Sequence, residues 1–439
     1  MKVLKFGGTT LGSAAMIKEV ANLIQKGNKN ITIVSAFKGT TNTLIEIAGC
    51  LYRKNPEEAG EIINQLENHY SILIAELYAS QESKTVAEDL LKKYFSVIRS
   101  SLSSLFTPFE EKTMLAQGEL ISSSLIYLLL KERQVDAVLI PALDFMRTDK
   151  NSEPDPVYIK EKLHKQLEKH SNANAYITQG YICRNAYGEI DNLGREGSDY
   201  TATLIGAAVQ AEEIQIWTDS DGLQNNDPRY VEHTSSIRCL QFEEAAELAY
   251  FGARILHPTC ILPAKLNNIP VHLLNTLNPE APGTIISNEM ESGKIKAVAA
   301  KDGITAIKIK SGRMLLAYGF LRKVFEIFEN YQTPIDMVVT SEVAVSLTID
   351  QTKHLDEILA DLNKYGQVSF DRNMTIICVV GDLDLDNLGF EFKVVQALKD
   401  VKVRMISYGG SSYSISFLIR TEDKQRALQA LSDNLFTLL

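Results

Sequence analysis

Strand-like and helical patterns alternate along the chain from Met1 to about Asn288, and this alternation limits the possible fold more than any other feature. The apolar run at 3–6 is followed by a helical pattern at 13–25 and by a second apolar run at 31–34. Short strands that alternate with helices are typical of βαβ units around a largely parallel sheet. The sequence therefore predicts an α/β domain. Its further strand-like runs lie at 137–140, 175–178, 213–218 and 284–286.

A long helical stretch interrupts this alternation between about Pro56 and Arg133. Leu, Ile and Glu recur there at spacings of three and four residues, with a break at Thr107-Pro108. We expect a helical subdomain that lies over the ligand-binding end of the sheet. A cluster of Pro and Gly at 279–283 indicates that the first domain, residues 1–290, ends soon afterwards.

The C-terminal part of the chain contains an internal repeat. Gly319-Phe320 and Lys323-Val324 recur as Gly389-Phe390 and Lys393-Val394, a shift of 70 residues (389 minus 319), which also places Ser341 on Ser411. Each copy reads strand, helix, strand, strand, helix. This order is that of the ferredoxin-like βαββαβ plan. We therefore predict two such domains, at residues 300–371 and 372–439.

Composition excludes several classes of protein. The chain has 439 residues, 45% of them hydrophobic, but no apolar stretch approaches the roughly 18–20 residues of a membrane span. Met1–Phe6 reads as a first strand and not as an export signal, so the expected location is the cytoplasm. Five scattered cysteines without a CxxC pair favour free thiols over disulfides or zinc. A formal net charge of −10 without a basic block argues against nucleic acid.

The run Lys5-Phe6-Gly7-Gly8-Thr9 follows a predicted strand and precedes a predicted helix. Glycines let the backbone approach an anion closely, and the start of a helix adds partial positive charge. A lysine beside such a loop suits the β and γ oxygens of a phosphoryl donor. An ordinary turn with paired glycines remains the alternative for this pattern.

Two further segments carry polar residues at predicted ligand-binding positions. One is Gly194-Arg195-Glu196-Gly197, which precedes an Ala-rich helix at 201–210. An arginine between two glycines in this position can bind a carboxylate or a phosphate. The alternative is a solvated turn without a ligand. Thr218-Asp219 ends a strand at the edge where parallel sheets bind ligands. The nearby Asp221-Gly222 and Asp227-Pro228 pairs are also common in simple turns.

Together these segments closely resemble the aspartate kinases of the amino-acid kinase family, almost from end to end. The tail resembles the paired ACT domains of these enzymes, and its 339–343 segment is most similar to the lysine-sensitive, single-function branch. The resemblance implies a mostly parallel sheet between helical layers, a helical subdomain and two ferredoxin-like ACT domains. Its other motifs are Val34-Ser35-Ala36, Thr41-Asn42, Gly118-Glu119-Leu120, Thr178-Gln179-Gly180, Gly197-Ser198-Asp199-Tyr200, Phe251-Gly252-Ala253, Leu256-His257-Pro258 and Pro282-Gly283-Thr284.

The resemblance implies that ATP phosphorylates the side-chain carboxylate of L-aspartate to give ADP and 4-phospho-L-aspartate, the first step of the lysine, threonine and methionine branch. A carboxylate with a pKa of about 3.9 is ionised at pH 7, so no general base is needed. The site must instead align two anions and neutralise their charge. The implied cofactor is Mg²⁺ bound to the phosphates of ATP. The Asp199 carboxylate is its single candidate ligand from the protein, and no other ligand is assigned.

The resemblance also implies a role for individual residues. Lys5 is the expected catalytic residue, because it would stabilise the transferred phosphoryl group. The other expected site residues are Gly7, Gly8, Thr9, Ser198 and Asp199 for phosphate, Thr41, Glu119 and Arg195 for aspartate, Thr218, Asp219, Gln224, Arg229 and Arg254 for the nucleotide, and Met314, Ala317, Phe320, Leu321, Asp336, Ser341 and Glu342 for the effector lysine.

Four positions depart from the family pattern. Glu196 stands where the family usually has Gly and is expected to lower affinity through its negative charge, while Gln224 and Arg254 replace a common Tyr and Lys near ATP. Ala317 replaces a Ser in the effector loop, which leaves Asp336 and Glu342 to hold a lysine ammonium, unless these acids are simply solvated. His257, before Pro258, is expected to be structural and not catalytic.

Two other hypotheses remain open at this point. One is a catalytically weak amino-acid sensor that keeps the ACT pair; the other is a related kinase with a different acceptor. Because paired ACT sheets usually associate across chains, a homodimer or higher homo-oligomer is the expected assembly.

Overall fold

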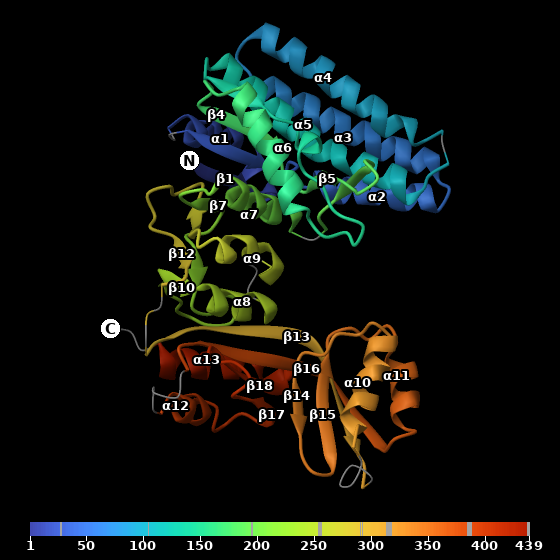
Figure 1. Cartoon of the computed structure of the whole chain (residues 1–439), viewed down its shortest axis with the longest axis vertical. Helices are drawn as coiled ribbons and strands as arrows, with labels where there is room; N and C mark the ends of the chain where they lie inside the picture. The colour runs from blue at the N-terminus through green and yellow to red at the C-terminus, as the bar shows by residue number, and fades with distance from the viewer. Residues whose placement is uncertain are drawn as a thin grey trace. The chain divides into compact units, whose positions relative to one another are not determined.

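A computed structural model of the chain describes residues 1–26, 29–103, 105–194, 196–252, 257–289, 291, 293–312, 318–383 and 389–436 (Figure 1). The chain divides into two compact units. The first consists of Met1–Leu223 and Leu256–Glu289, and the second of Gln224–Ile255 and Met290–Leu439.

The first unit is built around a mostly parallel sheet, as the alternating pattern predicts. Its strands follow the order β12-β11-β7-β1-β2-β4-β3, and only β12 runs antiparallel to its neighbour. The strands are β1 (Lys2–Phe6), β2 (Asn30–Val34), β3 (Ala137–Leu139), β4 (Ala175–Gln179), β7 (Ile214–Thr218), β11 (Val271–Asn275) and β12 (Thr284–Ser287).

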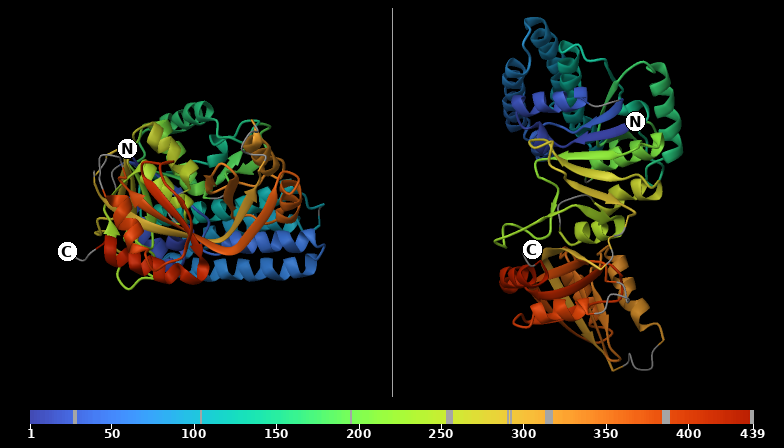
Figure 2. Two further views of the ribbon diagram at one scale, coloured as in Figure 1. Left: turned by 90° about the horizontal axis from the view of Figure 1, so that it is seen from below. Right: turned by 90° about the vertical axis from the view of Figure 1, so that its left-hand side faces the viewer.

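Helices cover both faces of this sheet (Figure 2). Successive side chains of a strand point to opposite faces. Leu4 and Phe6 of β1 therefore join the large apolar core beneath the helical subdomain, whereas Lys5 points to the other face, where it meets a side chain of α7 (Gly197–Val209). The other helices of the unit are α1 (Ala14–Lys26), α2 (Thr40–Tyr52), α3 (Pro56–Leu77), α4 (Gln81–Ser100), α5 (Pro108–Glu132), α6 (Pro156–Lys169) and α9 (Pro258–Leu266).

The predicted helical subdomain is present as α3, α4 and α5. Thr107 is the N-cap of α5 and forms a capping box with Glu110, with Pro108 at the first helical position. The break at Thr107-Pro108 is therefore a helix start, for which both residues are well suited.

One helix, α5, is long and apolar enough to cross a membrane by length and composition. In this structure 78% of its most apolar window is buried inside the protein. Its Leu125, Ile126, Leu129 and Leu130 lie in the core of the first unit, as expected for the apolar run at 125–130. The helix is thus accounted for as a core element.

The shorter elements connect the larger ones. The Ala-rich helix α7 begins at Gly197, four residues before the predicted start at Thr201, because the Gly197–Tyr200 turn is already helical. The short elements are η1 (Gly8–Leu11), η2 (Ala142–Asp144), β5 (Ile182–Arg184), β6 (Ile190–Asn192), β8 (Leu223–Gln224), β9 (Ser236–Ile237), β10 (Cys239–Gln241) and α8 (Phe242–Tyr250).

The C-terminal repeat forms one six-stranded sheet with the order β14-β15-β13-β16-β18-β17. The element order predicted for each copy is confirmed. The first copy contains α10 (Phe320–Asn330), β14 (Val338–Thr340), β15 (Ala344–Ile349) and α11 (Leu355–Leu362); the second contains α12 (Phe390–Ala397), β17 (Val403–Ser407), β18 (Ser414–Arg420), η4 (Thr421–Asp423) and α13 (Lys424–Leu435).

The two copies share two long strands, β13 (Ile295–Lys310) and β16 (Gln367–Gly381). The second half of β13 pairs with β15 and with the first half of β16, whereas the second half of β16 pairs with β18 and with the first half of β13. The sixth strand of the second copy thus comes from residues that precede the first copy. Because the repeat is interlaced in this way, a boundary at 371/372 falls inside β16, and the proposed domain limits stay predictions.

Each copy of the repeat has its own apolar core. One core packs α10 and α11 on β13 and β15, and the other packs α12 and α13 on β16 and β18. Val231, from the segment that precedes α8, belongs to the second core. Asn226 Nδ2 also donates to Leu428 O of α13 at 3.1 Å, so this segment is fixed to the second copy.

Candidate active site

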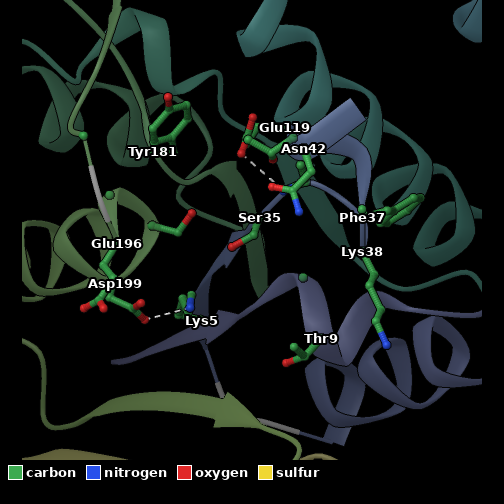
Figure 3. A pocket seen from close by; sticks show the side chains of 17 residues that line it. Lys5, Thr9, Ser35, Phe37, Lys38, Asn42, Glu119, Tyr181, Glu196 and Asp199 are labelled. Atoms are coloured by element: carbon green, nitrogen blue, oxygen red, sulfur yellow. Dashed lines mark hydrogen bonds and ion pairs between the residues drawn. The ribbon is translucent and has the colours of Figure 1, made fainter. Parts of the chain in front are cut away.

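A cavity of about 720 Å³ opens at the carboxyl ends of β1 and β2 in the first unit. This is the edge where open α/β sheets bind ligands. Figure 3 shows Thr9 and Lys38 on one side of the cavity, Asp199 and Glu196 on another, and Glu119 across from Lys5. The lining residues are Lys5, Gly8, Thr9, Ser35, Ala36, Phe37, Lys38, Gly39, Thr41, Asn42, Glu119, Tyr181, Gly194, Glu196, Gly197, Ser198 and Asp199.

Lys5 and Asp199 form a nearly buried ion pair in this cavity. Lys5 Nζ lies 2.7 Å from Asp199 Oδ1, and both side chains are about one-tenth exposed (10% and 11%). Each charge compensates the other in a region of low polarity, where an unpaired charge would be costly. The pair holds a cation beside the predicted phosphate loop.

Gly7 and Gly8, which follow β1, are favoured because neighbouring atoms leave little room for a Cβ, and not because the backbone is left-handed. A Cβ on Gly7 would lie 3.2 Å from Lys5 Nζ, and one on Gly8 would lie 3.2 Å from Ala36 O. Gly7 precedes the short 3₁₀ turn η1, and α1 begins only at Ala14. The predicted loop therefore leads first into a 3₁₀ turn, and the α-helix follows at Ala14, close to the predicted start at residue 13.

Glu119 of α5 is the most perturbed acid of the cavity. The residue is only 3% exposed, and its burial raises the pKa of the carboxyl group to about 8, although the Ala36 N–H, 3.4 Å from Oε1, opposes this rise. Its Oε2 atom is buried and accepts no hydrogen bond from the residues that the structure describes. A buried acceptor without a partner is costly unless a ligand supplies a donor.

Ten lining residues were not among the predicted site residues, and three of them bear on the chemistry of the cavity. Lys38 and Asn42 follow the Val34-Ser35-Ala36 motif, and Lys38 adds a second cation to the cavity. Tyr181 lies between β4 and β5 with a positive φ of 66°, and burial raises the pKa of its hydroxyl to about 12. Of these three, only Asn42 had a sequence signal, because it stands in the Thr41-Asn42 motif of the resemblance.

The described residues among those predicted for the nucleotide do not line the cavity. Thr218 ends β7, which is the neighbour of β1, and Asp219 follows it at the same edge of the sheet. Gln224 donates to Ser236 Oγ at 3.0 Å, while Arg229 is exposed and paired with Asp227 at 2.6 Å in the second unit. Arg195 and Arg254 lie outside the described residues.

The residues predicted for the effector have varied surroundings. Phe320 is buried in the first repeat core, Leu321 is 38% exposed and Glu342 is exposed. Ser341 Oγ donates to Ala344 O at 3.4 Å, and Asp336 is paired with Lys301. Met314 and Ala317 lie outside the described residues.

Comparison with known families gives two matches. Residues 1–275 match the amino acid kinase family, and residues 377–435 match the ACT domain. The chain is 32% identical to lysine-sensitive aspartokinase 3 of Escherichia coli (strain K12), with 99% of each chain covered.

Solved structures resemble the whole chain as well. Aspartokinase III of E. coli in complex with aspartate and ADP superposes with a TM-score of 0.85 at 32% identity, over 99% of this chain and 100% of the other. The same enzyme in complex with lysine and aspartate gives a TM-score of 0.81 at 32% identity, over 99% of each chain.

One cavity at the carboxyl edge of a parallel sheet is thus surrounded by the Lys5-Phe6-Gly7-Gly8 loop, a buried acid and an ion pair. The first 275 residues of the same chain match a kinase family. The chain belongs to the amino acid kinase family, and within that family to the aspartokinases with C-terminal ACT domains.

Proposed function

We propose that this cavity binds L-aspartate beside the terminal phosphate of ATP, and that the chain transfers the γ-phosphoryl group to the side-chain carboxylate. One carboxylate oxygen forms a bond to the γ-phosphorus while the bond to the β–γ bridging oxygen breaks, giving 4-phospho-L-aspartate and ADP. The proposal rests chiefly on one observation, the presence of Lys5 and the partnerless Glu119 Oε2 at a single cavity.

Glu119, Thr41 and Arg195 would hold the acceptor. The free Oε2 of Glu119 suits the ammonium group of aspartate, because a cation would satisfy the buried oxygen and favour its ionised form. Thr41 lines the same cavity at the start of α2. Arg195 follows Gly194, and its guanidinium would pair with the α-carboxylate.

Lys5 would stabilise the charge of the phosphoryl group during transfer. Its ammonium lies within reach of the Gly7-Gly8 loop, where the close approach of the backbone allows N–H groups to contact phosphate oxygens. Thr9 and Ser198 line the cavity beside them. We expect Asp199 to orient Lys5 in the absence of ATP.

Mg²⁺ is the expected companion of ATP. The described residues contain no group of three or more His, Cys, Asp or Glu side chains that could hold a metal ion by themselves. The Asp199 carboxylate lies beside Lys5 and could supply a single ligand. This arrangement fits an ion that is held mainly by the phosphates of ATP, whose charge it would reduce.

The remainder of the nucleotide is proposed to contact the predicted residues Thr218, Asp219, Gln224, Arg229 and Arg254. Thr218 and Asp219 follow β7, next to the strand that carries Lys5. For Arg229 the contact would require its guanidinium to leave Asp227, with which it makes two parallel bonds. The nucleotide role of this residue therefore has the least support.

L-Lysine is the proposed feedback inhibitor, with the ACT repeat as its binding region. The E. coli relative has been solved in complex with lysine and aspartate, and residues 377–435 of this chain match the ACT domain. We further propose a cytoplasmic homodimer or higher homo-oligomer that associates through the ACT sheets.

A hydroxamate trap tests the reaction directly. The acyl phosphate reacts with hydroxylamine, so the chain with Mg-ATP and L-aspartate should give a hydroxamate, detected as its coloured ferric complex, and L-glutamate should give far less. Absence of product with millimolar L-aspartate would contradict the proposed function. Inclusion of L-lysine, L-threonine or L-methionine in the same assay identifies the inhibitor.

A further inference from the structure

Lys38 is the second cation of the active-site cavity, and its charge is not compensated there. The residue is exposed and lines the cavity together with Lys5. The Lys5 ammonium lies 2.7 Å from Asp199 Oδ1, whereas the Lys38 ammonium makes no ion pair with the residues that the structure describes. A phosphate that enters the cavity therefore meets one lysine that is already paired and one that is available.

The phosphate loop Gly7-Gly8-Thr9 lies between these two lysines. A Cβ on Gly7 would lie 3.2 Å from Lys5 Nζ, and a Cβ on Gly8 would lie 3.8 Å from Lys38 Cα. Figure 3 shows Thr9 between Lys5 and Lys38. Because the loop has one lysine on each side, an anion that binds to its N–H groups can be contacted by both ammonium groups.

The side chain of Lys38 follows the 3₁₀ turn η1. A Cβ on Gly12, directly after this turn, would lie 3.2 Å from Lys38 Cδ. The main-chain N–H of Lys38 also donates to Leu11 O, at the end of η1, at 3.4 Å. Gly12 has no side chain, so the aliphatic part of Lys38 has room on the turn. These contacts keep Lys38 beside the phosphate loop.

The backbone around Lys38 is held by the helical subdomain. Tyr70 of α3 is buried, and its ring stacks on that of Phe37 with a centroid distance of 5.9 Å. The Tyr70 hydroxyl also lies 2.8 Å from the hydroxyl of Thr40, the first residue of α2. A cation on a fixed backbone loses less conformational freedom when it binds a ligand, so this segment is preorganised for binding.

The residues after Lys38 lead to the part of the cavity that is proposed for aspartate. Thr41 and Asn42, three and four residues further along, line the same cavity. Lys38 thus lies between the phosphate loop and the proposed acceptor. The γ-phosphate is the part of ATP that must approach both, because it is the group that is transferred.

We infer that Lys38 binds the γ-phosphate of ATP, on the opposite side of the phosphate loop from Lys5. The inference rests on the proposed function. An ammonium without a protein partner can form charge-assisted hydrogen bonds to phosphate oxygens, which are stronger than bonds between neutral groups. Lys38 therefore adds to the affinity for ATP before transfer, whereas the Lys5 charge is needed most during transfer.

Calorimetry on Lys38→Met in the full-length chain tests this inference. The ligands are ADP and AMP-PNP, an ATP analogue whose γ-phosphate is not transferred, each with Mg²⁺. We expect the Kd for AMP-PNP to rise about tenfold, the effect of one hydrogen bond to a charged group. The Kd for ADP should stay within about twofold of the wild-type value, because ADP lacks the γ-phosphate. Lys38→Arg, which keeps the charge, should recover most of the loss.

Two results would overturn the inference. One is an unchanged Kd for AMP-PNP in Lys38→Met, and a higher KM for aspartate in that case would assign Lys38 to the acceptor. The other is an equal rise in Kd for ADP and AMP-PNP, because the γ-phosphate would then not be the group that Lys38 contacts.

Lys160→Met is the matched control. Lys160 of α6 is exposed, lies outside the cavity and makes no ion pair with the described part of the chain. Its replacement changes the net charge by the same amount, so its Kd for AMP-PNP should equal that of the wild type. A similar rise in both variants would mean that overall charge is responsible and would also overturn the inference. Absence of acyl phosphate from a wild-type chain that binds AMP-PNP would contradict only the proposed function, since nucleotide binding is measured separately.

Discussion

The ammonium group of Lys301 lies 2.7 Å from Asp336 Oδ1 and 2.9 Å from Asp350 Oδ2. The Tyr250 hydroxyl donates to the same Asp336 oxygen at 3.0 Å, and Lys301 Nζ lies 4.6 Å from the centre of the Tyr250 ring. The Asp336 side chain is only 1% exposed. The acid that was expected to bind an effector ammonium is therefore already paired with an ammonium of the protein itself.

This pairing gives a prediction for Lys301→Met. Loss of the lysine leaves Asp336 buried beside Asp350 without a cation, so the free energy of unfolding should fall by about 3 kcal/mol. If effector lysine places an ammonium at Asp336, added L-lysine should raise the Tm of Lys301→Met more than that of the wild type. Differential scanning fluorimetry with and without L-lysine measures both effects.

Lys310→Met is the control, because Lys310 ends the same strand, is exposed and makes no ion pair with the residues that the structure describes. It should behave as the wild type does. An equal lysine-induced Tm shift in Lys301→Met and the wild type would show that effector lysine does not use Asp336.

Replacement of Lys5 tests the phosphoryl-transfer site. Its charge is needed most when the phosphoryl group is in transit, so Lys5→Ala should lower kcat by about 10²- to 10³-fold, with a small change in the KM for aspartate. The hydroxamate assay gives both constants. Lys2→Ala, on the same strand but in a partly exposed pair with Glu213 at 2.7 Å, should keep its kcat. Similar losses in the two variants would refute a catalytic role of Lys5.

The ion pair between His272 and Glu213 makes the stability of the first unit depend on pH. Glu213 raises the pKa of His272, and the hydrogen bond from His272 lowers the pKa of Glu213 to about 2. The His272 contribution is complete below its ordinary pKa of 6.5 and disappears as the pH rises through the higher folded-state value. The Glu213 contribution is complete above 4.5 and disappears toward pH 2.

His272→Gln should therefore lower the free energy of unfolding by about 1 kcal/mol at pH 6 and by clearly less at pH 9. Urea denaturation at the two pH values measures this difference. Only the protonated ring can donate to both Glu213 and Pro282 O, because both oxygens accept and the neutral ring has a single N–H. A loss that is equal at both pH values would mean that packing and not charge is responsible.

Much of this fold could be predicted from the sequence because its local patterns agree with the structure. The apolar run at 3–6, the Thr107-Pro108 helix start and the repeated Gly-Phe pairs each have a local physical signature. The exchange of strands between the two repeat copies had no local signature, because the first half of β13 pairs with the second half of β16, about 80 positions away in the sequence.

The site shows the same limit. Lys5, Gly8 and Glu119 were expected in one place and lie around one cavity. The partners of Glu196 and Asp336 were not expected. His257 is distant in sequence from Glu196, as Lys301 is from Asp336, and each pair is brought together only by packing. Charge at these positions could be predicted from the sequence, but the direction in which each side chain points could not.

Glu119 also makes the stability of the enzyme depend on pH. Its folded-state pKa of about 8 lies above its ordinary value of 4.5, so the folded protein holds the proton more tightly than the unfolded chain does. This stabilisation is complete below pH 4.5 and is lost as the pH rises through 8. Glu119→Gln, which stays neutral, should be more stable than the wild type at pH 9 by roughly a few kcal/mol and similar to it at pH 5.

The same titration should govern aspartate binding. The ammonium group of aspartate favours an ionised Glu119, whereas the free enzyme holds Glu119 mostly protonated below pH 8. The KM for aspartate should therefore fall about tenfold between pH 6.5 and pH 8.5. The KM for ATP should change over this range only through the ionisation of ATP itself. Glu119→Gln should have a high KM for aspartate that does not vary over this range. A wild-type KM that is constant with pH would show that Glu119 does not bind the ammonium group, even if Glu119→Gln were otherwise impaired.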